Sequence, residues 1–167
     1  MGIDSLISGL ALGVSAIASW FAIHSWREAT RPVVVAAVRT NVGGNVSITY
    51  DVVVSNTGTR PAVDVVLQPD MPALDAAFGA GAAHQRPIIM RCFDESHRIP
   101  LLVNGESLTN SFGLTTGDDT TSVWKYGSRI PVAIIYKDLE GRVYKSSVTL
   151  AIRDSSGFAG GSWQKAR

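Results

Sequence analysis

The residues best suited to chemistry are gathered in the run CFDESH at positions 92–97. A thiol, two carboxylates and an imidazole this close together could supply ligands to a transition metal. Structural zinc sites, however, take about four ligands from paired spacings, and the chain has no second pair. A polar connection beside a strand explains the same residues. We therefore expect no metal and no other cofactor.

Nucleophilic catalysis has equally little support. His84 and His97 are the available bases, since His24 adjoins an apolar run, and the chain has no G-x-S-x-G motif. Cys92 with His97 is a pair without a fold-specific context. The sequence therefore predicts a non-enzymatic protein with no catalytic residue.

Three further groups suggest binding chemistry at first sight. Asp118-Asp119 lacks EF-hand spacing, and Gly79-Ala80-Gly81 lacks the lysine of a phosphate loop. The aromatic residues Tyr50, Trp124, Tyr136 and Tyr144 fit strand packing better than a stacking platform. A net charge of +1 gives no electrostatic footprint for nucleic acid.

The most informative element is the apolar run at residues 6–23, which contains neither charge nor proline. An uncharged run of about 18 residues or more is typical of a transmembrane helix. We expect residues 1–26 to form a membrane anchor helix with its flank, and residues 27–31 to form a juxtamembrane linker.

Two other interpretations of this run remain open. Ala16-Ile17-Ala18 resembles a signal-peptidase site, but the preceding residues contain Asp4 and no Lys or Arg, and the apolar run continues to Ile23. A buried soluble helix is the other alternative. We favour a retained single-pass anchor, because a helix that is apolar all round has little else here to bury it.

Flanking residues predict the orientation of the anchor. Arg27, Arg31 and Arg39 follow the run, while no Lys or Arg precedes it. Positive flanks stay cytoplasmic, so we expect the β domain in the cytoplasm. Trp20, Trp26, Arg27 and Arg31 are the expected membrane-interface residues.

Small residues within the anchor suggest self-association. Gly9 and Gly13 form a GxxxG pair, with Ser5 one turn earlier. This spacing lets two helix backbones approach closely, although Gly is common in membrane helices and chance gives the same pattern. A homo-oligomer through this helix is therefore a prediction.

Beyond Pro32 the chain changes to β-rich segments. Alternating or β-branched runs predict strands over residues 32–39, 46–55, 62–67, 87–92, 99–103, 107–114, 129–137 and 142–152. Residues 69–85 suggest a long loop or a short helix near 74–78, and Gly141 suits the hairpin loop at 138–141. About seven short strands predict an all-β antiparallel sandwich over residues 32–153. Residues 154–167 form a Gly/Ser-rich tail that we expect to be flexible.

The alternation also predicts which side chains form the core. The expected inward faces are Ile48, Tyr50, Val52 and Val54, then Val63, Val65 and Leu67, and then Val132, Ile134 and Tyr136 with Val148 and Leu150. One cysteine cannot form an internal disulfide, so the fold does not depend on one.

Three segments of the β domain carry a family resemblance. VSNTGTRPAVDV at 54–65 and IPLLVNGES at 99–107 resemble turns of bacterial Ig-like domains related to the CARDB group. YKDLEGRVY at 136–144 is similar to the final hairpin of small bacterial and phage proteins with one N-terminal membrane helix. The resemblance implies an Ig-like sandwich and a role in adhesion, scaffolding or binding.

These observations lead to two predicted functions. The first is a membrane-anchored interaction or scaffolding module that contacts membrane lipid and a protein partner, with loops 69–84 and 115–121 as candidate binding surfaces. The second is a phage-encoded or envelope assembly subunit with self-associating helices and tiling sandwiches. An enzyme on a sandwich scaffold would need convergent polar groups, which the sequence does not offer.

Overall fold

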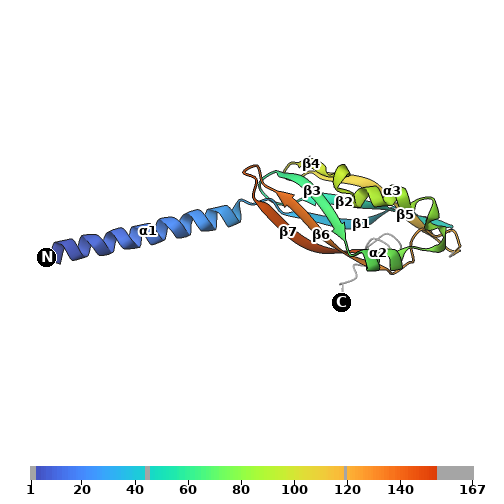
Figure 1. Cartoon of the computed structure of the whole chain (residues 1–167), viewed down its shortest axis with the longest axis horizontal. Helices are drawn as coiled ribbons and strands as arrows, with labels where there is room; N and C mark the ends of the chain where they lie inside the picture. The colour runs from blue at the N-terminus through green and yellow to red at the C-terminus, as the bar shows by residue number, and fades with distance from the viewer. Residues whose placement is uncertain (1–2, 44–45, 119, 154–167) are drawn as a thin grey trace. The chain divides into compact units, whose positions relative to one another are not determined.

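The computed structural model describes residues 3–43, 46–118 and 120–153, and side-chain positions from residue 8 onward (Figure 1). The chain divides into two compact units, residues 1–31 and 32–167, which are described separately. The predicted tail at 154–167 and the side chain of Ser5 lie outside the described residues.

The first unit is a single helix, α1 (Ile3–Ala29). Its described side chains from residue 8 to 29 are all exposed. The segment Ser8–Ala29 has a mean hydropathy of 1.3 and is long and apolar enough to cross a membrane. The helix ends where Thr30 caps it, with Oγ1 donating to the Trp26 carbonyl at 2.8 Å, just before Pro32 disfavours further helix.

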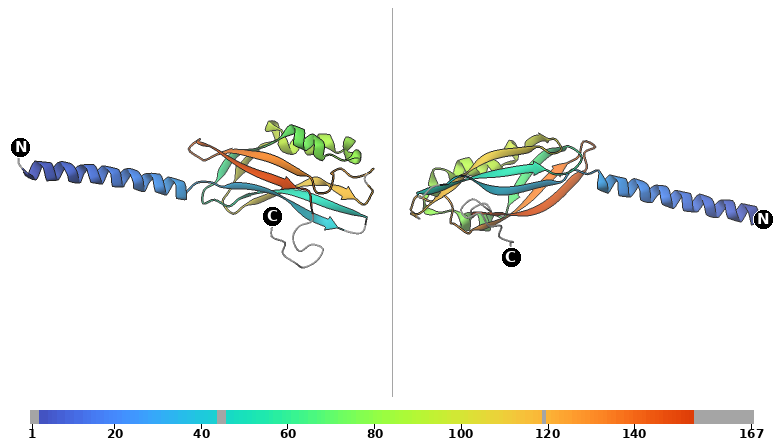
Figure 2. Two further views of the ribbon diagram at one scale, coloured as in Figure 1. Left: turned by 90° about the horizontal axis from the view of Figure 1, so that it is seen from below. Right: turned by 180° about the vertical axis from the view of Figure 1, so that it is seen from behind.

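The second unit consists of seven antiparallel strands in two sheets, which Figure 2 shows as separate layers. One sheet has the order β1-β2-β5, formed by β1 (Val34–Gly43), β2 (Ser47–Asn56) and β5 (Ser107–Thr116). The other has the order β4-β3-β6-β7, formed by β4 (Ile99–Leu102), β3 (Ala62–Pro69), β6 (Arg129–Lys137) and β7 (Val143–Ala151). The prediction of about seven antiparallel strands is confirmed.

Short helices form the connection between β3 and β4. They are α2 (Met71–Ala77), α3 (Arg86–Met90) and the 3-10 turns η1 (Ala80–Ala83), η2 (Arg91–Phe93) and η3 (Glu95–His97). Asp70 caps α2 by accepting a 2.9 Å hydrogen bond from the Ala73 amide, as N-cap carboxylates commonly do.

The predicted strand at 87–92 is wrong. This stretch is helical because Pro87 occupies the first turn of α3, where a missing N–H costs no hydrogen bond. One side of the helix packs against the core, so that Ile89 is 2% exposed while Ile88, on the other side, is 61% exposed.

Alternate strand residues fill the space between the sheets, as predicted. Tyr50, Val52 and Val54 are buried on β2, and Val132, Ile134 and Tyr136 on β6. Val63 differs from the expected pattern and is only half-buried. A register shift between Val63 and Val66, with Asp64 at φ 53°, breaks the alternation in β3.

At one end of the sandwich, the predicted binding loop at 69–84 packs against the end of the loop at 115–121 and the two residues that follow it. The Gly79 amide donates to the Val123 carbonyl at 2.8 Å, and the Gly81 amide to the Ser122 carbonyl at 2.9 Å. A Cβ on either glycine would collide with the opposite backbone. These glycines therefore serve close loop packing, beside a stack in which Trp124 lies between Phe78 and Phe112.

Asn56 joins the two sheets at the other end. Its Nδ2 donates to the carbonyls of Arg60 and Leu102, at 2.7 and 3.0 Å. Its Oδ1 accepts from the amides of Val33 and Gly58, at 3.2 and 3.0 Å. The side chain is 1% exposed, so this network satisfies a buried amide completely.

Candidate binding groove

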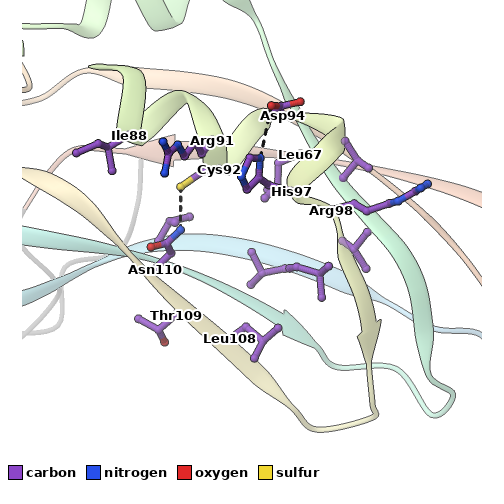
Figure 3. A pocket seen from close by; sticks show the side chains of 15 residues that line it. Leu67, Ile88, Arg91, Cys92, Asp94, His97, Arg98, Leu108, Thr109 and Asn110 are labelled. Carbon is purple, nitrogen blue, oxygen red and sulfur yellow. Dashed lines mark hydrogen bonds and ion pairs between the residues drawn. The ribbon is translucent and has the colours of Figure 1, made fainter. Parts of the chain in front are cut away.

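A groove of about 510 Å³ opens along the side of the sandwich where β4 and β5 end their sheets (Figure 3). Its apolar floor comes from the inner faces of both sheets and consists of Val52, Val54, Val65 and Leu67. Its rim carries the polar side chains Arg91, Asp94, His97, Arg98, Thr109 and Asn110. An apolar cavity with a few polar groups is the usual form of a ligand site.

The groove exists because β4 and β5 follow each other in the chain but enter different sheets. Their connecting turn is fixed by Gly105 at φ 75° and by Glu106, whose Oε2 accepts from the Val103 amide at 2.9 Å. Beyond this turn the strands diverge, and the first five residues of β5 are exposed. Leu108 points inward and is nevertheless 39% exposed.

Asp94, Ser96 and His97 form a local network on the rim. Asp94 accepts from the Ser96 amide at 3.0 Å and from the Ser96 hydroxyl at 2.8 Å, and that hydroxyl lies 2.9 Å from His97 Nδ1. These hydrogen bonds from Ser96 hold the pKa of Asp94 below its usual value, with a smaller contribution from His97.

The arrangement is a capped turn and differs from a catalytic triad. In a triad the serine and the carboxylate contact opposite nitrogens of the imidazole. Here both oxygens lie on the Nδ1 side of His97, with Asp94 Oδ2 at 3.5 Å. The geometry therefore accounts for these residues as the cap of η3.

Cys92 lies on the groove wall, half-buried and facing β5. Its Sγ accepts a hydrogen bond from Asn110 Nδ2 at 3.3 Å (Figure 3). Burial raises the pKa of the Cys92 thiol, and the hydrogen bond from Asn110 only partly offsets this effect. Within the described residues no group of three or more His, Cys, Asp or Glu side chains could hold a metal.

Two arginines give the rim its charge. Arg98 lies 3.7 Å from Asp64, which is held more closely by Lys137 at 3.0 Å. The hydrogen bond and charge of Lys137 keep the pKa of Asp64 below its usual value, and Arg98 contributes less. Arg91 is exposed on the rim and has no ion pair among the described residues.

Cys92, Asp94 and His97 of the predicted cluster all line the groove. Cys92 contacts Asn110, however, while Asp94 and His97 contact Ser96, so the three do not meet at one point. The predicted self-association residues Gly9 and Gly13 face open space on α1. The predicted interface residues lie further along the same helix or just after it, namely Trp20, Trp26, Arg27 and Arg31. Trp20 stacks on His24 at 5.6 Å, and Arg31 pairs with Glu28 at 3.2 Å.

Sequence reasoning missed the groove itself. Its floor consists of three buried valines and one buried leucine, which are indistinguishable in sequence from other core residues. A usable signal was present in β5, whose first residues contain no charge and no proline although they lie at a sheet edge.

Comparison with protein families matches residues 5–156 to a family described as a domain of unknown function, DUF8453. The match extends over both the apolar helix and the β domain, whereas no CARDB or other Ig-like family matched the chain. No curated protein matched the chain. No solved structure matched it either.

Proposed function

The chain belongs to the DUF8453 family, and we propose that it is a membrane-anchored, non-enzymatic binding module whose ligand occupies the groove between β4 and β5. One observation carries this proposal: a groove with an apolar floor runs along one side of the sandwich under a rim of polar and charged groups, and two apolar side chains that line it, Ile88 and Leu108, are 61% and 39% exposed. Exposing these apolar side chains to water has a free-energy cost that a ligand would remove.

The proposal of a non-enzymatic role rests on the geometry of the rim. Catalysis needs polar groups that converge on one reacting atom. Among the described rim residues, Asp94 and His97 are engaged with Ser96 in a turn, while Cys92 faces Asn110 on the opposite wall. This arrangement favours recognition over chemistry.

We also propose that the β domain is an Ig-like sandwich. If the seven strands are lettered A to G in chain order, the sheets are A-B-E and D-C-F-G. Constant-type immunoglobulin domains have A-B-E-D and C-F-G. The two arrangements differ only in the sheet that receives the fourth strand, which supports the relationship.

The helix supports the membrane part of the proposal. Ser8–Ala29 spans about 33 Å at the α-helical rise, close to the hydrocarbon thickness of a bilayer. Because the family match begins at residue 5, the helix belongs to the shared region, as expected of a retained segment. The charges of Arg27, Arg31 and Arg39 favour a cytoplasmic β domain, since acidic neighbours such as Glu28 have little effect on orientation.

The second candidate is an assembly subunit. It is favoured by the exposure of every described side chain of α1, which leaves Gly9 and Gly13 available to a second helix. Size measurement in mild detergent separates the two proposals. A defined oligomer that is lost in Gly9→Leu favours assembly, and a monomer favours the binding module.

Site-directed photo-cross-linking in the native membrane tests the binding module. A benzophenone amino acid at Leu108 should form covalent adducts, because Leu108 lines the groove. The matched control is the same replacement at Leu139, which is 66% exposed on the β6–β7 hairpin. Equal adducts at both positions, or none at either, would overturn the proposal.

A further inference from the structure

We propose that the occupant of the groove is an extended peptide segment of another protein, which adds a strand to the outer edge of β5 and places an acidic group between Arg91 and Arg98. This inference rests on the proposed function and specifies its ligand. Strand addition of this kind uses main-chain hydrogen bonds for affinity and side-chain pockets for specificity.

The four sheet edges differ in how they are protected. In natural proteins a charged side chain or a proline in an edge strand usually prevents pairing with a strand of another chain. Three of the edge strands in the described chain have such a residue: Arg39 in β1, Pro100 in β4 and Lys145 in β7. The sequence of β5, SLTNSFGLTT, has neither. Of the two edges that adjoin the groove, β5 is therefore the one open to another strand.

Strand order gives a second reason. In a sheet of order A-B-E-D, the fourth strand pairs with the edge of the fifth. Here β4 pairs with β3 instead, so that β5 has β2 as its strand partner in the described sheet. A peptide beside β5 would take the place that a fourth strand fills in the constant-type arrangement.

Main-chain geometry identifies the groups that would pair. The Asn56 amide donates to the Glu106 carbonyl at 3.0 Å, where β2 meets β5. Along an antiparallel strand, the main-chain N–H and C=O groups of successive residues point alternately to one neighbour and to the other. The main-chain groups of Leu108 therefore point to β2, and those of Thr109 point to the free edge. Residues 107–110 offer an edge of about 13 Å, at the usual rise per strand residue.

Side-chain chemistry sets the class of peptide. Alternate residues of an added strand would point toward the apolar floor at Val54 and Val65. Arg91 has no ion pair among the described residues, and Arg98 shares Asp64 with the closer Lys137. The one rim carboxylate, Asp94, is occupied by Ser96. The charge balance therefore favours an acidic group in the ligand.

Cys92 provides the readout, since it is the single cysteine of the chain and lines the groove. The full chain is placed in phosphatidylcholine nanodiscs and its alkylation by N-ethylmaleimide is timed. The probe is a capped peptide of alternating threonine and valine that ends in aspartate. We expect peptide at about nine times its Kd to occupy nine-tenths of the sites and so to slow alkylation about tenfold. An unchanged rate at millimolar peptide would overturn the inference.

Thr109→Pro removes one outward N–H without touching the β2 ladder, and it should abolish the protection. Thr109→Ala keeps that N–H and should preserve it. Because the proline variant could fail to fold, the same peptide methylated on alternate amide nitrogens supplies an independent arm and should not protect Cys92. Protection that survives both changes would exclude strand addition.

Charge and ligand class complete the test. Replacing the aspartate of the peptide by asparagine, or Arg91→Gln in the protein, should weaken binding about fivefold to tenfold, or about 1 kcal/mol.

Decanoate tests a small amphiphile as the occupant. If decanoate protects Cys92 and the peptide does not, the inference fails while the proposed groove function stands. Loss of Leu108 cross-linking, by contrast, removes the proposed function itself.

Discussion

The two long sides of the sandwich are built differently. Along the side formed by β1 and β7 the sheets are joined, since the Ser146 hydroxyl donates to the Val34 carbonyl at 2.9 Å. Nearby, the Tyr136 hydroxyl donates to the Pro32 carbonyl at 3.3 Å. Along the side formed by β4 and β5 the sheets diverge, and Leu108 remains 39% exposed. One side is closed by hydrogen bonds between the sheets, and the other leaves the apolar side chain of Leu108 accessible.

Under the proposed function, one side of this small domain stabilises the fold and the other binds the ligand. Hydrogen bonds between the sheets fix their spacing on the closed side, and Asn56 adds a link to β4 through the Leu102 carbonyl at 3.0 Å. The open side can then keep apolar surface in contact with water, because the remaining core stabilises the fold. The predictions below compare equivalent changes in the closed and open regions.

The largest effect is expected for Ile134→Ala. Ile134 is fully buried on β6, and truncating a buried aliphatic side chain typically costs about 2–5 kcal/mol. The full chain in detergent should show a clearly lower melting temperature by near-UV circular dichroism. Lys137→Ala on the same strand removes an exposed ion pair with Asp64 and should cost at most about 1 kcal/mol. Equal small shifts would show that β6 does not anchor the closed region.

Asn56→Ala should be the next most damaging change. It removes four hydrogen bonds of a side chain that is 1% exposed, leaving buried donors and acceptors unsatisfied at a cost of about 2–4 kcal/mol. Chemical denaturation of the full chain measures this loss. Asn41→Ala, at an exposed position of β1, is the matched control, and a comparable loss there would contradict the role of Asn56 in joining the sheets.

Particular residues show why the fold could be predicted and the groove could not. Strict alternation at Ile130, Val132 and Ile134 identifies β6 without other information, because one face must be buried. The segment 87–92 misled prediction, since its short apolar stretch Ile88-Ile89-Met90 fits a strand or a helix equally well. What decides it is the contact of Ile89 with the core, which only the folded chain provides.

The floor of the groove leaves no mark in the sequence. Val54 and Val65 line it, yet they are 4% and 1% exposed and have the sequence pattern of any other core valine. The groove beside them depends on β4 pairing with β3 rather than with β5, which is a long-range event. Asn56 was visible as a turn residue in the N-x-G motif, but its contact with Leu102 across 46 positions was not predictable.

A smaller, pH-dependent effect is expected at Asp138 on the β6–β7 hairpin. Asp138 is 3% exposed. Burial alone would raise its pKa, but hydrogen bonds from the Arg142 amide at 2.8 Å and the Tyr144 hydroxyl at 3.0 Å outweigh burial and lower it. A lowered folded pKa gives stability that is present above the unfolded value of about 3.9 and is lost as pH falls through the folded pKa.

Thermal unfolding from about pH 7 to pH 3 measures this contribution. Asp138→Asn should be less stable than the natural chain at neutral pH, and the difference should shrink on acidification. Glu140→Gln, on the same hairpin but in an exposed pair with Arg60, should show no such convergence. A difference that stays constant over this range would mean that the Asp138 carboxylate does not stabilise the closed region.

The smallest effect on stability is expected for Leu108→Ala, which repeats the aliphatic truncation of Ile134 on the open side. Leu108 already has 39% of its surface in water, so its removal deletes little buried area and should cost less than about 1 kcal/mol. The same change should nevertheless weaken Cys92 protection by the acidic peptide, because Leu108 lines the groove. A loss of stability as large as that of Ile134→Ala would show that the β4–β5 side is part of the closed core, and the contrast between the two sides would then fail.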